Sequence, residues 1–198
     1  MPLPVFEKSI FETILARRSV RKYKPNKVEN STIGNLLEAA VRAPTAIHQE
    51  PWAFVIIQDL SLLKTLSDHA KPVFLEEVQQ YRSTQDDHRL DMFESPDFNI
   101  FYNANTLIVI CGKTASPFFS ADCWLAAENL MLAACAMDLG SCVIGSAIPA
   151  FNVPSMRAKL RIPESYTVVA PIIIGYPDEE IYPTSRKSPL IFSSIYAH

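Results

Sequence analysis

The stretch from Asp122 to Leu139 is apolar around nearly the whole circumference of the helix that it is expected to form. A helix without a polar face has to be covered on every side. A chain of 198 residues can supply only part of that cover, so a second copy of the chain is an obvious source of the rest. The stretch therefore predicts a central helix that ends at Gly140 and lies at the interface of a homodimer.

The remaining pattern predicts strands and helices around one sheet. Short apolar runs predict strands over 52–58, 106–111, 141–144 and 166–174. Amphipathic spacing predicts helices over 10–17, where Ser9 and Glu12 form a capping box, over 31–43 and over 61–70. We therefore expect an α+β fold, an α/β sandwich whose central mixed sheet is flanked by helices, in a single domain of residues 1–198.

Two segments depart from this pattern. Residues 72–100 are polar and rich in charge and glutamine, and they are longer than an ordinary connection. We predict a lid over a site, with short helices around Leu75–Tyr81 and Asp86–Phe93; a surface insertion without a role in the site is the alternative. Residues 176–198 contain three prolines and predict an extended C-terminal arm with one strand-like piece at Leu190–Phe192.

Composition argues against several classes of protein. The net charge is −3 without a basic stripe, which gives nucleic-acid binding no electrostatic support. No apolar run reaches the length of a membrane span, and the N-terminus lacks the pattern of a signal peptide. The four cysteines have no CxxC spacing, so we expect reduced thiols and a cytoplasmic protein. Metal-ligand spacing and the GxGxxG, GxxxxGK and GxSxG motifs are absent from the sequence.

Three cations and a hydroxyl follow the first predicted helix within five residues: Arg17, Arg18, Ser19 and Arg21. Guanidinium groups suit phosphate and carbonyl-rich ring edges, because several donors point in fixed directions. A second basic pair, Arg186 and Lys187, could close on the same phosphate. The alternative is a solvated basic patch that complements the dipole at a helix end.

The segment Pro44–Trp52 is the second candidate. Small residues such as Ala46 let backbone amides approach a ligand closely, while His48 and Glu50 alternate towards one side of the chain. The alternative is a surface loop with a satisfied histidine and a salt-bridged acid.

Together these motifs resemble the nitroreductase family of flavin enzymes. The family loop reads Pro-Ser-x-x-Asn-x-Gln-Pro-Trp, and His48 and Glu50 stand at its Asn and Gln positions. The helix from Asp122 leads into a strand similar to the family's Gly-Leu-Gly-x-x-Trp-x-Gly, with Val143 where Trp is common. The other matching motifs, in chain order, are Arg17–Arg21, Gly175-Tyr176-Pro177 and Arg186-Lys187.

The resemblance implies an intimate homodimer with exchanged C-terminal arms that holds FMN at the subunit interface. It assigns the FMN phosphate, ribityl chain and ring edge to Arg17, Arg18, Ser19 and Arg21, with Arg186 and Lys187 joining at the phosphate. It places Thr45, Ala46 and His48 along the flavin ring, from the neighbouring subunit, and the amides of Gly145 and Ser146 near flavin N5. NAD(P)H would reduce the flavin and leave, and a nitroaromatic, quinone or related acceptor would replace it, without a catalytic side chain.

Two alternatives remain. The His-x-Glu-Pro-Trp variant is similar to the iodotyrosine deiodinase branch, whose lid holds a zwitterionic amino acid with a Glu and a Tyr. Glu77 and Tyr81 have that spacing and would share a helix face as substrate contacts. The lysine that this branch also needs is missing from Asp97–Phe101. The other alternative is a non-enzymatic FMN-binding protein that stores or senses flavin.

Overall fold

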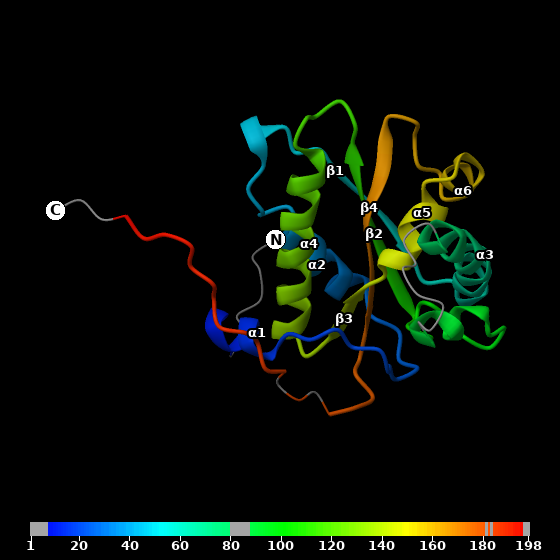
Figure 1. The fold of residues 1–198 in the computed structure, drawn as a ribbon, viewed down its shortest axis with the longest axis horizontal. Helices are drawn as coiled ribbons and strands as arrows, with labels where there is room; N and C mark the ends of the chain where they lie inside the picture. Colours follow the sequence, from blue (N-terminus) through cyan, green and yellow to red (C-terminus); the bar gives the residue numbers. More distant parts are fainter. Residues whose placement is uncertain (1–7, 80–87, 181, 183, 196–198) are drawn as a thin grey trace.

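A computed structural model describes residues 8–79, 88–180, 182 and 184–195. Its strands form one antiparallel sheet in the order β1-β2-β4-β3, with helices on both faces (Figure 1). The strands are β1 (Trp52–Ile57), β2 (Thr106–Lys113), β3 (Gly140–Val143) and β4 (Tyr166–Gly175). The helices are α1 (Ile10–Ala16), α2 (Asn30–Ala40), α3 (Leu60–Gln79), α4 (Phe119–Ala136), α5 (Ile148–Phe151) and α6 (Pro154–Lys159). Short 3₁₀ turns are η1 (Ala46–His48), η2 (His88–Glu94) and η3 (Gly145–Ala147).

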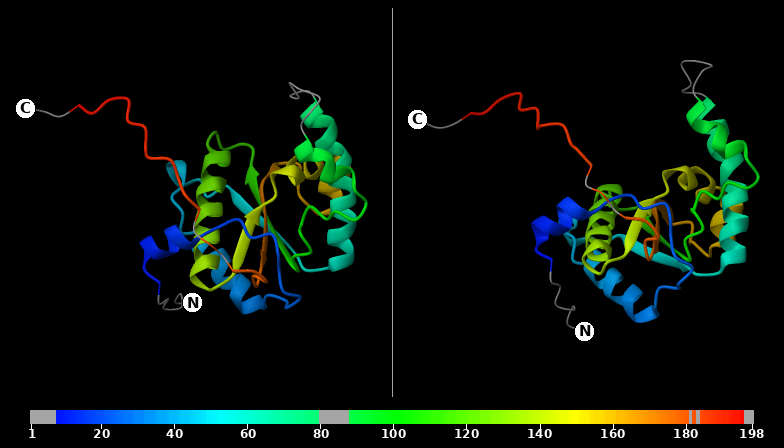
Figure 2. Two further views of the ribbon diagram at one scale, coloured as in Figure 1. Left: turned by 60° about the horizontal axis from the view of Figure 1, so that its bottom comes forward. Right: turned by 90° about the horizontal axis from the view of Figure 1, so that it is seen from below.

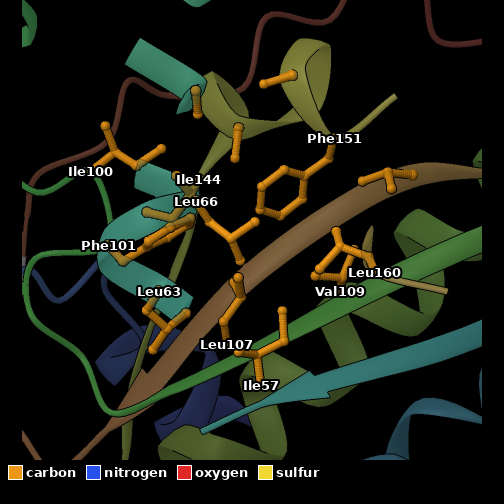
Figure 3. Packing of buried hydrophobic residues seen from close by; sticks show 14 of the residues in the cluster. Ile57, Leu63, Leu66, Ile100, Phe101, Leu107, Val109, Ile144, Phe151 and Leu160 are labelled. Carbon is orange, nitrogen blue, oxygen red and sulfur yellow. The ribbon is translucent and has the colours of Figure 1, made fainter. Parts of the chain in front are cut away.

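The sheet separates two hydrophobic cores. Because successive side chains of a strand point to opposite faces, Leu107 and Val109 of β2 pack with α3 and α5, the core drawn in Figure 3. Ile108 and Ile110 of the same strand pack with α2 and α4 on the other face. The strands are apolar on both faces, which is typical of a sheet buried between two helical layers.

The predicted α+β class is confirmed, but the prediction of a mixed sheet is wrong for the described strands. All three ladders, β1 with β2, β2 with β4 and β3 with β4, are antiparallel. The parallel pairing is limited to an isolated bridge between Ser19 and Ser141. The apolar pattern of a strand indicates only that both of its faces are buried. It does not indicate whether the neighbouring strands run parallel or antiparallel to it.

The prediction that a helix ends near Ala70 is also wrong, because α3 continues through Pro72 to Gln79. Proline removes the N–H that would bond the Asp68 carbonyl and normally ends or kinks a helix. Here tertiary contacts support the turn around it. The buried Lys71 ammonium donates to the carbonyls of Ser95 (3.0 Å) and Phe98 (2.9 Å), so α3 stays joined to the segment beside it.

The central helix α4 ends earlier than Leu139, and Gly140 is not its stop. Leu139 N–H donates to the Ala134 carbonyl (2.8 Å) and Asp138 N–H to that of Cys135 (3.2 Å), the two bonds of a Schellman motif. Asp138 takes the left-handed conformation at φ 57°, which its short polar side chain tolerates. Gly140 instead allows a close approach, since an added Cβ would lie 2.7 Å from Val20 Cβ.

Large apolar side chains remain exposed on several elements. Among them are α1, whose Phe11 is 75% exposed, and α4, whose Leu125 is 46% exposed. The C-terminal arm extends away from the body in both views of Figure 2, and its Phe192 is 94% exposed. The predicted strand-like piece at Leu190–Phe192 forms no strand in this single chain.

Among the described helices, none combines the length and apolar content that a membrane crossing requires.

The contact between Gly140 and Val20 leads to a prediction. Gly140→Ala should lower the free energy of unfolding by about 1–3 kcal/mol, because the new methyl group overpacks against Val20. The loss should be smaller in a Val20→Ala background, and urea unfolding measures both. Gly34→Ala is the matched control: its Cβ would meet nothing within 4 Å, so helix propensity should leave stability equal or up to about 1 kcal/mol higher. An equal loss with and without Val20 would contradict the contact.

Candidate functional site

Three arginines that follow α1 and one arginine of the C-terminal arm surround a cavity of about 440 Å³, which we call the arginine pocket. Its lining residues are Arg17, Arg18, Ser19, Val20, Arg21, Glu179, Glu180, Tyr182, Thr184 and Arg186. The structure therefore brings together the predicted cluster and Arg186, although 165 positions separate Arg21 from Arg186 in the sequence. Lys187 is exposed and does not line the pocket.

The edge of the sheet holds the arginine segment in place. Val20 N–H donates to the Ser141 carbonyl on β3 (3.0 Å), and the buried Val20 side chain packs against Gly140. In an extended chain, neighbours of an inward-facing residue face outward, so Ser19 and Arg21 are directed away from this contact. Arg17 is braced by Glu128 of α4, with 3.5 Å between Nε and Oε1.

The arm closes the pocket from the other side. Arg18 Nε donates to the Tyr182 carbonyl (3.2 Å), and Arg186 donates to the Thr184 hydroxyl (2.8 Å). Two carboxylates, Glu179 and Glu180, also line the cavity, and the Tyr182 hydroxyl is hydrogen-bonded to Glu180. The lining has four guanidinium groups and two carboxylates, and Glu128 outside the lining pairs with Arg17, so an excess of positive charge remains that suits an anion.

Sequence reasoning missed Glu179, Glu180, Tyr182 and Thr184. In the arm, the sequence assigns a ligand contact only to the basic pair, since its prolines predict extension without a partner. The sequence still contained a signal for these residues. If the arm brings Arg186 to the arginine cluster, the residues just before Arg186 come close to the cluster as well.

A second, smaller cavity of about 70 Å³ also has Arg21 in its lining, and we call it the apolar cavity after the Phe, Ile and Val side chains around it. It is lined by Arg21, Phe93, Phe98, Ile100, Tyr102, Cys142, Val143, Ile144, Gly145 and Ser146. Cavities that hold a whole organic ligand usually measure several hundred Å³, so this one can seat only an edge of a ring system. Gly145 is exposed, and a Cβ added there would meet nothing within 4 Å, so its backbone is open to a ligand.

The thiol of Cys142 faces this cavity but is not poised for chemistry. Burial raises the pKa of Cys142, and the nearby Arg21 opposes that rise only in part. The thiol is therefore protonated at neutral pH and behaves as a small apolar group.

The predicted loop residues Thr45, Ala46 and His48 are not brought to the arginine pocket within one chain. Asp122, in the first turn of α4, accepts the Ala46 N–H (3.1 Å), whereas Arg17 contacts the same helix farther along, at Glu128. Figure 1 shows the loop and α1 beside opposite ends of α4. Asp122 is a positioning residue that sequence reasoning missed, since its role depends on a contact across 76 positions.

The loop itself is a strained turn. Ile47, His48 and Glu50 all have positive φ, at 48°, 53° and 44°. Such a conformation is uncommon outside glycine and is disfavoured for a β-branched residue. The side chains of Ile47, His48 and Glu50 are exposed, and Glu50 lines a cavity of about 430 Å³ that shares no described lining residue with the arginine pocket.

The predicted lid is only partly described. Glu77 lies exposed near the end of α3 and lines neither of these two cavities. Tyr81 and the predicted helix start at Asp86 lie outside the described residues. The helix expected around Leu75–Tyr81 is helical as far as Gln79, where this described stretch ends, but it is the end of α3 and not a separate helix. Among the described residues, no three His, Cys, Asp or Glu side chains gather as a metal site would require.

This chain is similar to known proteins both in sequence and in structure. A model of the nitroreductase family matches residues 14–176. A protein of Archaeoglobus fulgidus with the provisional name NADH dehydrogenase/NAD(P)H nitroreductase is 28% identical over 173 residues, 84% of each chain. Iodotyrosine deiodinase of Thermotoga neapolitana is 23% identical over 87% of this chain and 90% of its own. The crystal structure of a nitroreductase with bound FMN from Bacteroides fragilis is 27% identical, with a TM-score of 0.79, and covers 96% of this chain and all of its own.

These similarities confirm the predicted fold class and the predicted resemblance. The family match runs from α1 through all four strands to the start of the arm. This chain therefore belongs to the nitroreductase family.

Proposed function

We propose that this protein is an FMN-dependent oxidoreductase that uses NAD(P)H to reduce nitroaromatic, quinone or related electrophilic acceptors by a ping-pong mechanism. The observation that carries the proposal is the arginine pocket, where four guanidinium groups converge from two distant segments. The similarity to a nitroreductase with bound FMN and to a protein with an NADH dehydrogenase name supports it.

The residues present fit FMN at its phosphate end. A phosphate monoester carries close to two negative charges, which the surplus of arginine over carboxylate in the pocket can balance. Arg17, Arg18, Ser19 and Arg186 would hold the phosphate and ribityl chain. Lys187 could join them at the phosphate only if the exposed arm moved.

The ring end is incomplete in one chain. Gly145 and Ser146 would face one edge of the flavin from η3, beside the apolar cavity. Thr45, Ala46 and His48 would cover the ring from a second subunit, because their own subunit holds them away from the pocket. The proposed assembly is therefore an arm-exchanged homodimer of single-domain subunits.

When bound, FMN would take up hydride from the nicotinamide and deliver it to the acceptor. The chain's own residues bind, orient and exclude water, and no side chain has to act as an obligate proton donor. The free and largely buried cysteines agree with this passive role: burial raises the pKa of Cys111 to about 11 and that of Cys123 to about 12. Free buried thiols also suit the proposed cytoplasmic location.

The first test of this function is bound FMN. The purified protein should be yellow, and Arg18→Ala or Arg186→Ala should weaken FMN binding roughly ten- to a hundredfold, because each removes a charge-assisted hydrogen bond. The rate of flavin reduction at saturating FMN should change much less. Flavin fluorescence gives the affinity and anaerobic stopped flow the rate.

Arg161→Ala is the matched control, since Arg161 is an exposed arginine just beyond α6, in the other helical layer. It should leave FMN affinity unchanged. A colourless protein that takes up no FMN would refute the function. Flavin reduction abolished by a single Cys or His substitution, with FMN still bound, would refute the absence of a catalytic side chain.

The second test concerns the arm. Deleting residues 188–198 should weaken both the dimer and FMN retention, because Leu190, Ile191, Phe192 and Ile195 expose large apolar side chains that need a cover. Obligate interfaces commonly bury about 2,000–5,000 Å² in total. Light scattering with simultaneous flavin absorbance measures both quantities, and far-UV circular dichroism should be unchanged. A stable monomer with full FMN would contradict the proposed link.

A second candidate function is reductive dehalogenation of a halotyrosine, favoured by the relative named iodotyrosine deiodinase. The substrate carboxylate would need a cation near residues 95–101. Lys71 reaches this segment, but its ammonium is buried and already bonded to the carbonyls of Ser95 and Phe98. An unpaired carboxylate in a dry pocket costs several kcal/mol, which ranks this candidate second.

Halotyrosines should therefore bind the oxidised enzyme weakly, while a neutral halophenol of the same size binds at least as well. Flavin fluorescence titration compares the two directly. Micromolar halotyrosine binding that is lost in Glu77→Gln would reverse the ranking of the two functions. Steady-state NAD(P)H oxidation with a quinone separates both enzymes from a protein that only stores or senses flavin.

A further inference from the structure

Arg21 borders both cavities. Among the described lining residues it is the one shared by the arginine pocket and the apolar cavity. Its guanidinium carbon lies over the ring of Tyr102, 5.8 Å from the ring centroid. A cation over an aromatic face is attracted by the negative charge of the π face, so Tyr102 restrains a long side chain that is otherwise exposed.

Tyr102 is itself the end of a row of aromatic rings that starts on α3. The centroids of Phe74 and Phe93 lie 4.8 Å apart, those of Phe93 and Phe98 5.3 Å, and those of Phe98 and Tyr102 5.7 Å. The last two pairs meet edge to face, the arrangement that aromatic pairs prefer. The row therefore holds the Tyr102 ring against α3, on the face of the sheet where Tyr102 itself packs.

The backbone at Tyr102 is held in a costly conformation. Tyr102 and Asn103 have φ of 51° and 56°, in the left-handed region that bulky residues avoid. Asn99 locks the turn: its side-chain oxygen accepts the Phe101 N–H (2.9 Å) and its carbonyl accepts that of Tyr102 (2.8 Å). Ser67 on α3 accepts the Ile100 N–H (3.1 Å). Strain that several independent contacts maintain is characteristic of functional sites.

We propose that Tyr102 is a positioning residue whose ring holds the Arg21 guanidinium between the phosphate end and the ring end of the site. Arg21 is then already placed when FMN enters, and less side-chain entropy is lost on binding. The inference rests on the FMN binding proposed above. The proposal also gives residues 93–102 a role other than that of a lid, because their aromatic rings hold the side chain of Arg21 in one orientation.

A double-mutant cycle tests the proposal. Tyr102→Leu should raise the dissociation constant of FMN roughly three- to tenfold, the range expected when a cation–π contact is lost. Tyr102→Phe keeps the aromatic face and should stay within about twofold of the wild type. In an Arg21→Ala background, Tyr102→Leu should have no further effect. FMN release on dilution of the holoenzyme, followed by flavin fluorescence, gives the four constants.

Phe74→Leu is the matched control, because it shortens the same aromatic row at the end far from Arg21. It should lower the melting temperature and change FMN affinity much less than Tyr102→Leu does, because Phe93 and Phe98 still pack against the Tyr102 ring. Equal losses from Tyr102→Leu with and without Arg21 would overturn the proposal while leaving FMN binding intact. A wild-type protein that binds no FMN would overturn both this inference and the function on which it rests.

A second measurement keeps the proposal falsifiable if Tyr102→Leu fails to fold. In the wild-type holoenzyme, the side-chain protons of Arg21 should be shifted upfield by the Tyr102 ring current. Arg21→Lys assigns the signal. A resonance at the ordinary arginine position would overturn the proposal.

Discussion

The contact of Val20 with Gly140 is the constraint on which the site depends. An added Cβ at Gly140 would lie 2.7 Å from Val20 Cβ, and Val20 N–H is hydrogen-bonded to Ser141 at the same place. This contact joins the segment after α1 to the sheet at β3. Since alternate residues of an extended segment face opposite ways, the burial of Val20 directs Ser19 and Arg21 outward. Gly140, which the sequence pattern predicts as a helix stop, thus sets the direction of Arg21.

Arg21 connects the two halves of the proposed chemistry. It lines the arginine pocket, where charged side chains dominate, and also the apolar cavity, where Phe, Ile and Val side chains gather. A flavin mononucleotide has the same division between phosphate and ring. In the apolar cavity burial raises the pKa of Cys142, so this thiol stays protonated and the chain offers orientation there.

Contiguous features of the site could be predicted from the sequence, and features that depend on distant contacts could not. Arg17, Arg18 and Arg21 lie in one short segment, and the resemblance linked them to Arg186, which the structure places in the same pocket. The continuation of α3 through Pro72 was missed because it rests on Lys71 bonds to carbonyls more than twenty positions away. The turn at Tyr102 was missed for the same reason, since no local pattern predicts a left-handed tyrosine. The roles of Thr45, Ala46 and His48 stay predictions.

In one subunit, large apolar side chains stay exposed and the proposed flavin site is incomplete. Both features involve the same two elements, α4 and the C-terminal arm. Helix α4 exposes Leu125. Its Asp122 also holds the loop at Ala46, and this loop does not reach the arginine pocket of its own chain. The arm exposes Phe192 and also carries Arg186. In the proposed dimer, a ligand that binds only the assembled site stabilises the assembly by mass action. The coupling is reciprocal, so the same contacts that join the subunits would tighten the hold on FMN.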